Sequence, residues 1–275
     1  DFNYYWETLP PKDSQLRKAS EFFMKAAAPP QFLTSIAKFR MFPESDVPEV
    51  AFVGRSNVGK SSLLNAMVNA NIKDILARTS KTPGCTKTMN LYGVGGLKGG
   101  GGVRIKKGNG QFNRVSGRGG LVIVDLPGYG EGSHQEWGAE IMKYLSKRKQ
   151  LRRVFVLISA KEGVMPSDQQ LLSALRENGV PHQVLLSKLD KIYVPSAEKL
   201  VRVASRQGGN AGKAVPKGNF EDVRKKMQGV REQVQGERGG GALGELLGVS
   251  SEVSIEGKRM GMDAVRVAVL RAVGL

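Results

Sequence analysis

The stretch EVAFVGRSNVGKSSLLNA, residues 49–66, decides the fold of this chain. It opens with the apolar run EVAFVG at 49–54, which predicts a buried strand, and it closes with KSSLLNA, whose apolar spacing predicts a helix. Between them, GRSNVGKS at 54–61 follows the pattern Gly-x-x-x-x-Gly-Lys-Ser, in which glycines let successive backbone N–H groups face a phosphate. This order indicates a phosphate-binding loop, in which Lys60 reaches the β and γ phosphates and the Ser61 hydroxyl ligates Mg²⁺.

The rest of the chain repeats the alternation of apolar strands and amphipathic helices that begins here. Strands that alternate with helices form mostly parallel sheets covered on both faces. The pattern therefore predicts an α/β fold of the P-loop NTPase type, a three-layer αβα domain with a mostly parallel six-stranded sheet. Its strands are expected at 49–54, 88–93, 121–125, 154–160, 182–187 and 246–251. Its later helices are expected at 135–150, 167–179 and 261–273.

Three stretches lie outside this alternation. Residues 1–47, with a helix expected at 14–27, are interpreted as an N-terminal extension that lies against the main domain of residues 48–275. Residues 93–120 are rich in glycine and carry six basic side chains and no acidic one, so a flexible hairpin extension or a disordered segment is expected. Residues 196–244 carry ten basic and five acidic side chains. Both basic stretches are expected to be insertions into one domain.

The charge of the chain favours a polyanionic partner. Its 275 residues include 42 Lys and Arg against 25 Asp and Glu, a net charge of +17, and each phosphate that such a surface neutralises releases condensed counterions. The alternative is that the charge serves solubility or the general basicity of an organelle. The single cysteine, Cys85, rules out an internal disulfide and fits a reducing compartment. No apolar run approaches the ~18 residues of a membrane span, so none is expected.

A second motif concerns the base of the nucleotide. LLSKLD, residues 185–190, places Lys188 and Asp190 two positions apart at the end of an expected strand. An aspartate carboxylate accepts hydrogen bonds from guanine N1–H and the 2-amino group, a donor pair that adenine lacks, while a lysine stem lies over the base. Alone, this motif is more often a solvated loop, but downstream of a phosphate loop it predicts guanine recognition. VSS, residues 249–251, follows the next strand, where backbone N–H groups are expected to meet guanine O6.

The metal side of the site is expected at the end of the strand LVIVD. Asp125 ends that strand, where a carboxylate holds Mg²⁺ through water, and Gly128 three residues later places its N–H on the γ phosphate. Between the phosphate loop and this strand lies the polar segment 77–90, from which Thr86 is the expected second hydroxyl on Mg²⁺. Such a segment is expected to order when the γ phosphate is present and to loosen after hydrolysis.

These residues resemble the EngB (YihA) GTPases of the TRAFAC class, ribosome-assembly factors related to Era and EngA. The matching text is GRSNVGKSSLLNA, LARTSKTPGCTKTMN, VDLPGYG, the Trp and YLSKR of the following helix, and SKLDK. With the expected sheet order it covers most of residues 47–192 and 246–275. The chain departs from the bacterial form in its N-terminal extension, in its two basic insertions, and in Ser187, where the base motif usually has Asn or Thr. The serine is expected to keep guanine selectivity and to weaken one supporting hydrogen bond.

The resemblance implies a GTP-hydrolysing switch that binds GTP and GDP with Mg²⁺. The family has a hydrophobic or aromatic residue in place of the catalytic glutamine of other GTPases, here Tyr129, and several members use K⁺ held partly by a phosphate-loop asparagine, here Asn57. K⁺ would add positive charge where phosphoryl transfer develops negative charge, so intrinsic hydrolysis is expected to be slow and to need a partner. Catalytic roles are expected for Asn57, Lys60, Thr86, Asp125 and Gly128. Nucleotide contacts are expected from Gly54, Arg55, Ser56, Asn57, Val58, Gly59, Lys60, Ser61, Ser62, Gly84, Thr86, Asp125, Gly128, Ser187, Lys188, Asp190, Ser250 and Ser251.

Basic side chains near the expected switch suggest an RNA surface. KYLSKRKQLRR, residues 143–153, follows the loop after Asp125 and is densely basic. An ordinary solvated helix face is the alternative. Two further basic stretches on the same domain favour RNA, because phosphate contacts need Lys and Arg but no special fold. The expected RNA contacts are Lys106, Lys107, Lys147, Arg148 and Lys149.

The sequence therefore predicts a GTP-binding and hydrolysing switch that assists assembly of the large ribosomal subunit. The expected partners are the precursor of that subunit, its rRNA, and ribosomal proteins or other assembly factors. One alternative is a catalytically weak nucleotide-binding protein that clamps RNA of the ribosome, and another is an ATP-using P-loop enzyme. The basic insertions, a pI near 10 and a start at Asp1 instead of Met suggest a eukaryotic organelle protein of the mitochondrial matrix, with another organelle or the cytoplasm as alternatives.

Overall fold

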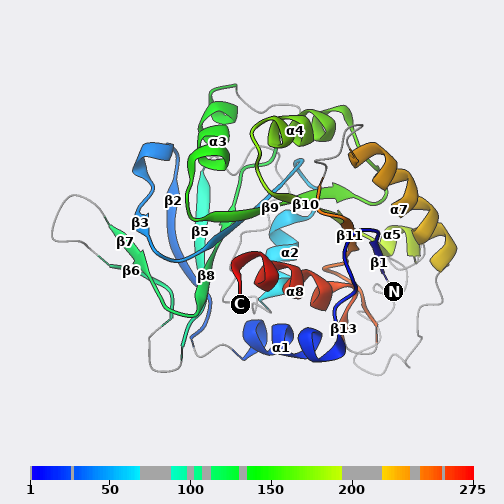
Figure 1. Cartoon of the computed structure of the whole chain (residues 1–275), viewed down its shortest axis with the longest axis horizontal. Helices are drawn as coiled ribbons and strands as arrows, with labels where there is room; N and C mark the ends of the chain where they lie inside the picture. Colours follow the sequence, from blue (N-terminus) through cyan, green and yellow to red (C-terminus); the bar gives the residue numbers. More distant parts are fainter. Residues whose placement is uncertain are drawn as a thin grey trace, which may run out of the picture.

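One twisted sheet forms the centre of the protein (Figure 1). The computed structural model describes residues 2–25, 28–68, 88–97, 102–106, 113–129, 135–193, 219–235, 242–255 and 258–275. Five strands run parallel in the order β8, β4, β9, β10, β11, and β5 joins β8 in the antiparallel sense. Their bounds are β4 Glu49–Gly54, β5 Met89–Gly95, β8 Gly120–Asp125, β9 Leu151–Ser159, β10 His182–Ser187 and β11 Glu245–Gly248. All six expected strands are confirmed, and the mostly parallel sheet with them.

Within the described residues the sheet has eight strands, so the prediction of six was wrong. The N-terminal segment adds β1 (Asn3–Tyr5), antiparallel to β11, and β2 (Gln31–Ile36), antiparallel to β5. Both are edge strands whose residues are mostly half-buried or exposed, so neither has the continuous apolar run by which the inner strands were recognised. β1 and β2 form because the edges of β11 and β5 offer unpaired backbone N–H and C=O groups, and the sequence pattern does not indicate this pairing.

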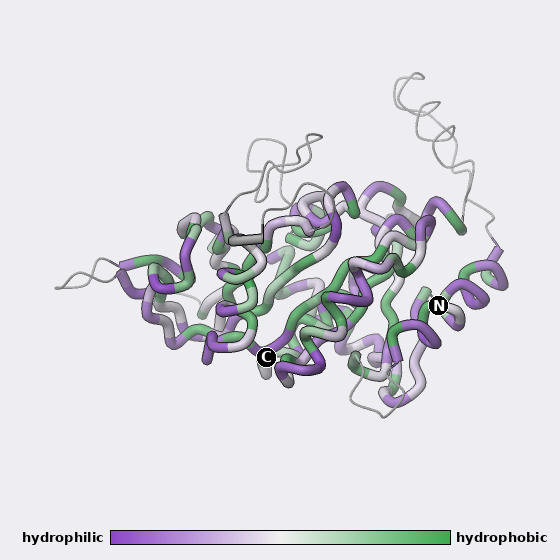
Figure 2. The backbone as a smooth tube through the Cα atoms, turned by 90° about the horizontal axis from the view of Figure 1, so that it is seen from above, coloured by the Kyte–Doolittle hydropathy of each residue, from purple (hydrophilic) through white to green (hydrophobic). Residues whose placement is uncertain are grey.

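Helices cover both faces of the sheet and give the expected three layers (Figure 1). Adjacent residues of β4 point to opposite faces: Val50 and Phe52 pack toward one helix layer, Ala51 and Val53 toward the other. The tube in Figure 2 shows mainly hydrophobic strands between helices of mixed hydropathy. The first layer contains α1 Asp13–Met24, α2 Lys60–Met67 and α8 Met262–Val273, and the second contains α3 Gln135–Lys147, α4 Pro166–Glu177 and α7 Phe220–Val234.

Helix α7 lies within the basic stretch 196–244. It buries Val223, Met227, Val230 and Val234, a stripe with helical spacing that joins the core of the second layer. The stripe is narrow and its flanks are rich in charged and polar residues, so the net basic composition concealed it. Residues 220–234 therefore form a core helix that precedes β11.

Two short strands of the basic stretch 93–120 belong to a second, smaller sheet. It consists of β3 (Glu44–Ser45), β7 (Arg114–Ser116) and β6 (Arg104–Lys106), in that order. Some of the glycines that suggested flexibility instead allow close packing: a Cβ on Gly120 would lie 2.3 Å from Cγ2 of buried Val103.

The remaining short elements are the 3-10 turn Phe39–Met41, α5 (Asp190–Tyr193) and the hairpin of β12 (Ser254–Ile255) with β13 (Lys258–Arg259). Among the helices of the described residues, none combines the length and apolar character needed to cross a membrane.

Candidate nucleotide-binding site

The glycine loop lies where the sequence places it, between the carboxyl end of β4 and the start of α2. Its backbone turns through the left-handed region at Asn57 (φ +64°) and Gly59 (φ +96°), which Gly and Asn adopt at the lowest cost. At Gly54 a Cβ would lie 2.8 Å from Cγ1 of Val58, so only glycine fits there. The loop therefore has the local geometry that the phosphate-loop motif predicted.

Lys60 and Asp125 meet beneath this loop. Lys60 is the first residue of α2 and Asp125 ends β8, the parallel neighbour of β4, so the carboxyl ends of the two strands bring them together. The Lys60 ammonium contacts Oδ1 of Asp125, with 8% and 3% of the two side chains exposed. Ser61 follows on α2, and its hydroxyl together with the Asp125 carboxylate provides the hard oxygen donors that Mg²⁺ prefers. The residues present thus fit a magnesium ion shared with nucleotide phosphates.

Backbone hydrogen bonds dock Gly128 against the loop. Tyr129 pairs with Arg55 in a short parallel bridge, in which the Ser56 N–H donates to the Tyr129 carbonyl at 3.2 Å and the Tyr129 N–H to the Gly54 carbonyl at 3.4 Å. A Cβ on Gly128 would lie 3.0 Å from Oγ and 3.1 Å from N of Ser56. The segment after Asp125 is thereby fixed close to the phosphate loop.

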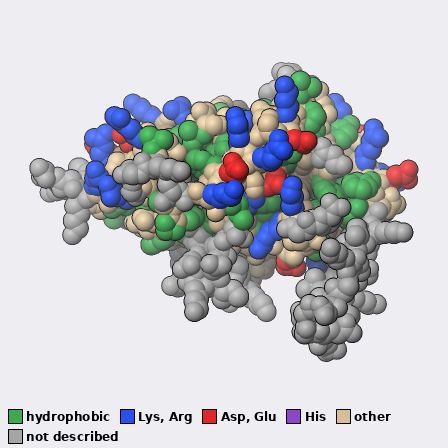
Figure 3. Space-filling view, turned by 90° about the horizontal axis from the view of Figure 1, so that it is seen from below, with side chains coloured by type: hydrophobic (Ala, Val, Ile, Leu, Met, Phe, Trp, Pro, Cys, Tyr) green, Lys and Arg blue, Asp and Glu red, His purple; other side chains and the backbone are tan. Residues whose placement is uncertain are grey.

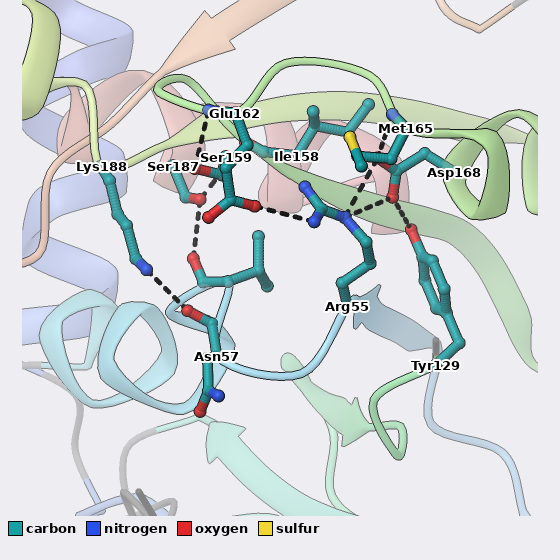
Figure 4. Close-up of polar contacts among 11 residues, drawn as sticks. Arg55, Asn57, Tyr129, Ile158, Ser159, Glu162, Met165, Asp168, Ser187 and Lys188 are labelled. Carbon is teal, nitrogen blue, oxygen red and sulfur yellow. Dashed lines mark hydrogen bonds and ion pairs between the residues drawn. The ribbon is translucent and has the colours of Figure 1, made fainter. Parts of the chain in front are cut away.

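The base motif is tied to the same loop. The Ser187 hydroxyl lies 2.7 Å from the Val58 carbonyl and 3.3 Å from that of Ile158, and since it has one proton, the shorter contact is the stronger hydrogen bond. Lys188, at φ +56°, donates from Nζ to the Asn57 carbonyl at 2.7 Å (Figure 4). Asp190 begins α5 and is buried. Serine at 187 therefore still joins the base motif to the phosphate loop.

The segment at 249–251 differs from the expectation at two residues, because the Val249 N–H donates to the Leu186 carbonyl at 2.8 Å and the Ser250 N–H is also used. The Ser250 N–H, expected to face guanine O6, already donates to the Met260 carbonyl at 3.0 Å. Its buried hydroxyl accepts from the N–H groups of Glu252 and Val253 at 3.2 and 3.1 Å, so Ser250 stabilises the turn. The turn itself lies beside the base motif, because the Leu189 N–H donates to the Val249 carbonyl. Ser251 remains the candidate for contact with the base.

The structure thus gathers most of the expected nucleotide residues at one edge of the sheet. Gly54 to Ser62, Asp125, Gly128, Ser187, Lys188 and Asp190 come from the ends of β4, β8 and β10 and the turns that follow. Gly84 and Thr86 lie outside the described residues. No group of three or more His, Cys, Asp or Glu side chains within the described ranges is arranged to bind a metal on its own.

Sequence reasoning missed a polar cluster beside the loop, drawn in Figure 4. The buried carboxylate of Asp168, in the first turn of α4, accepts from the Tyr129 hydroxyl at 2.6 Å, from Arg55 Nε at 3.2 Å and from the Met165 N–H at 2.9 Å. Nη1 of Arg55 also lies 2.7 Å from Oε2 of Glu162. Burial and the neighbouring Asp168 charge raise the pKa of Tyr129 far above its usual value, so its hydroxyl stays protonated. The only sequence signal was an acidic residue after a proline, which reads as an ordinary helix start.

Arg148 corrects the set of expected RNA contacts. Its guanidinium is turned inward onto the fully buried Glu49, with Nη2 2.6 Å from Oε1, and it stacks over the Phe42 ring. The Tyr144 hydroxyl donates to the same carboxylate at 3.2 Å, and burial together with the Glu49 charge raises the pKa of that tyrosine. A basic residue that neutralises a buried carboxylate is not available to a phosphate. Of the other expected contacts, Lys106, Lys147 and Lys149 are exposed and Lys107 lies outside the described residues.

The fold and this site together define a P-loop GTPase. Residues 49–188 match the protein family described as 50S ribosome-binding GTPase. The probable GTP-binding protein EngB of Mesorhizobium japonicum is 37% identical over 175 residues, which cover 62% of this chain and 74% of the relative. The EngB of Rhizobium leguminosarum bv. trifolii is 33% identical over 224 residues, which cover 80% and 92%. The chain belongs to the EngB family of GTP-binding proteins and is a GTP-hydrolysing enzyme, so the ATP-using alternative is wrong.

Two further similarities extend this comparison. MIOREX complex component 8 of Saccharomyces cerevisiae is 33% identical over 218 residues, 70% of this chain and 61% of the yeast protein. The crystal structure of a single-residue variant of Aquifex aeolicus Era bound to GDP and AlF4⁻ superimposes with a TM-score of 0.51 at 19% identity, over 82% of this chain and 57% of Era. The chain therefore spans less than two thirds of either protein. The likeness to Era concerns the fold alone.

Proposed function

We propose that this GTPase is a molecular switch that assists assembly of the large ribosomal subunit and binds rRNA through its basic segments. The observation that carries the RNA part is the outer face of the hairpin β6–β7. Figure 3 shows Lys and Arg side chains gathered at the end of the molecule that contains this hairpin. The family description, 50S ribosome-binding GTPase, supports the ribosomal part.

The hairpin separates apolar from basic side chains. Ile105 and Val115 are paired across the strands and pack inward, so Arg104, Lys106 and Arg114 share the outward face. Lys106 stands directly opposite Arg114, and like charges in this arrangement destabilise a hairpin. Arg114 lies 3.5 Å from Asp46, but no carboxylate of the described residues lies within 4 Å of Arg104 or Lys106. A polyanion bound to this face would remove the repulsion, as RNA phosphates do.

In this proposal, different segments of the site bind the phosphates, the base and the metal. Those backbone N–H groups of the loop that are not bonded within the protein surround the phosphates, and Lys60 leaves Asp125 to bind the β and γ phosphates. Asp190 accepts the hydrogen bonds of guanine, and the stem of Lys188 lies over the plane of the base. Ser61, Thr86 and Asp125 would hold Mg²⁺, which neutralises charge on the phosphate oxygens when bound. The Gly128 N–H meets the γ phosphate.

Asn57 is the proposed K⁺ ligand. Its own carbonyl is taken by Lys188, whereas Figure 4 shows its side chain directed away from Lys188, so the amide oxygen is not used by that contact. A monovalent cation there would supply the positive charge that a glutamine-free site lacks. Tyr129 is hydrogen-bonded to Asp168 on the other side of the loop and does not replace the glutamine. The proposal includes slow intrinsic hydrolysis that a ribosomal partner accelerates.

We propose the mitochondrial matrix as the location. The similarity to yeast MIOREX complex component 8 and the net charge of +17 support an organellar member over a bacterial-type cytoplasmic one. Its partners in the proposal are the precursor of the large subunit and its rRNA, with ribosomal proteins or other assembly factors beside them.

Reversing charges on the hairpin tests the RNA proposal. The double variant Arg104→Glu, Lys106→Glu is expected to weaken binding to large-subunit rRNA fragments and to lower the slope of log K against log salt by about 1 to 2, because up to two phosphate contacts are lost. Arg17→Glu, Lys18→Glu on the exposed side of α1 changes the net charge equally and is the matched control. Equal losses for both variants would mean that total charge, not this face, determines binding.

A further inference from the structure

Four side chains from four elements or turns converge beside the phosphate loop (Figure 4). Arg55 belongs to the loop, Tyr129 follows Gly128, Glu162 lies in the turn after β9, and Asp168 is in the first turn of α4. We call these four residues the Arg55 cluster. Although Arg55 is part of a loop that receives phosphates, its guanidinium is turned toward the two carboxylates, 3.2 Å from Asp168 and 2.7 Å from Glu162.

The side chains of the Arg55 cluster depend on one another for their positions. Asp168 is fully buried, and a buried carboxylate is tolerated only when its oxygens are paired. Its three donors are the Arg55 guanidinium, the Tyr129 hydroxyl and the Met165 N–H. Loss of any one leaves buried charge less compensated, so Asp168 and Arg55 together fix the position of Tyr129 and the start of α4.

The position of Tyr129 determines that of Gly128. The ring is anchored at its hydroxyl, and the backbone of the same residue is paired to the phosphate loop at Gly54 and Ser56. Gly128 precedes Tyr129, so the two contacts of Tyr129 restrain the chain that follows Gly128. The chain that precedes Gly128 is restrained by Asp125, the last residue of β8.

We infer that Arg55 and Asp168 are positioning residues for GTP hydrolysis, which anchor Tyr129 so that the Gly128 N–H is preset for the γ phosphate. Tyr129, at the position of the absent glutamine, then acts as a tether of the switch segment instead of orienting water. The inference rests on the proposed contact of Gly128 with the γ phosphate. It predicts that loosening the cluster weakens binding of a nucleotide with a γ phosphate and leaves GDP binding nearly unchanged.

Tyr129→Phe tests the inference with minimal change of shape. The variant keeps the ring and loses the hydroxyl that donates to Asp168. Affinities for GDP and for a non-hydrolysable GTP analogue are measured by fluorescence titration, and hydrolysis by single turnover. The ratio of analogue affinity to GDP affinity is expected to fall about 10- to 100-fold, the effect of one hydrogen bond to a charged group, and the hydrolysis rate to fall with it.

Tyr144→Phe is the matched control. It removes another buried tyrosine hydroxyl bonded to a carboxylate, that of Glu49, at a place remote from the phosphate loop. Both variants lose stability, but only Tyr129→Phe is expected to change the affinity ratio. An unchanged ratio in Tyr129→Phe, or equal losses for both nucleotides, would overturn the inference.

Gly128→Ala separates this inference from the assignment on which it rests. Its new Cβ would crowd Ser56 at 3.0 Å and displace the Gly128 N–H directly. If Gly128→Ala lowers the ratio and Tyr129→Phe does not, the γ-phosphate contact stands and the tether is wrong. If neither variant changes the ratio, the assignment of Gly128 itself fails and the inference fails with it.

Discussion

The ion pair between Lys60 and Asp125 allows one prediction to be worked out in detail. Both side chains are more than nine-tenths buried, so replacing Asp125 by Asn leaves the Lys60 ammonium buried without a counter-charge. Removal of one partner from a buried pair costs about 3–5 kcal/mol, and since the amide oxygen still accepts a hydrogen bond, we expect about 3 kcal/mol. At about 2 °C per kcal/mol for a chain of this size, the nucleotide-free variant should melt about 6 °C lower than the wild type.

Bound GDP should reverse about half of this loss or more. In the wild type, Lys60 must leave Asp125 to reach the phosphates, whereas in Asp125→Asn it is already free of its partner. With EDTA present, to exclude the role of Asp125 toward Mg²⁺, the variant should therefore bind GDP at least about tenfold more tightly than the wild type, equivalent to about 1.4 kcal/mol. Thermal unfolding with and without GDP, together with calorimetric titration in EDTA, measures both effects.

A second buried pair provides the control. Glu49→Gln leaves Arg148 without its carboxylate in the same way, but far from the phosphates. That variant should melt lower with and without GDP, by equal amounts. If GDP protects Asp125→Asn no more than it protects Glu49→Gln, the Lys60 ammonium does not exchange Asp125 for phosphate and the reasoning is refuted.

Two further predictions concern the base and the basic surface. Asp190→Asn should weaken GDP binding by about 100-fold or more, since two hydrogen bonds to a carboxylate are lost, and should strengthen binding of xanthosine diphosphate; parallel losses for both nucleotides in a titration would speak against base recognition by Asp190. Arg148→Ala should destabilise the protein by about 3–5 kcal/mol, because Glu49 is left buried and without its charged partner. Under conditions in which the variant is fully folded, its rRNA affinity should equal that of the wild type. Lys149→Ala should lower rRNA affinity and leave the stability of the protein nearly unchanged. Reduced RNA affinity in a fully folded Arg148→Ala would restore Arg148 as a contact.

The sequence identified those parts of the molecule that depend on neighbours along the chain. The glycine loop, the strand before it and the helix after it are contiguous, and their steric demands, such as positive φ at Gly59, are local. Strands with continuous apolar runs were recognised for the same reason. Ser187, Lys188 and Asp190 were located because their motif directly follows such a strand.

Features built from residues distant in sequence could not be predicted in this way. Arg55 and Asp168 are brought together only when β4 and β9 pair, and nothing around either residue indicates the other. Arg148 reads as one of several surface cations until Glu49, on a different element, turns it inward. Ser250 was expected to face the base, and its N–H is instead taken by Met260, whose position depends on the turn that follows β11.

Single-turnover GTP hydrolysis in the presence of large ribosomal subunits tests the central claim most directly. Phosphate release is followed with the full chain alone and with isolated large subunits, each in K⁺ and in Na⁺. The proposal predicts slow release by the chain alone, acceleration by the subunit, and faster release in K⁺ than in Na⁺. Release that the subunit does not accelerate in either salt would contradict a ribosome-linked switch, and a subunit that binds the protein without any phosphate release would identify it as a nucleotide-dependent RNA clamp instead.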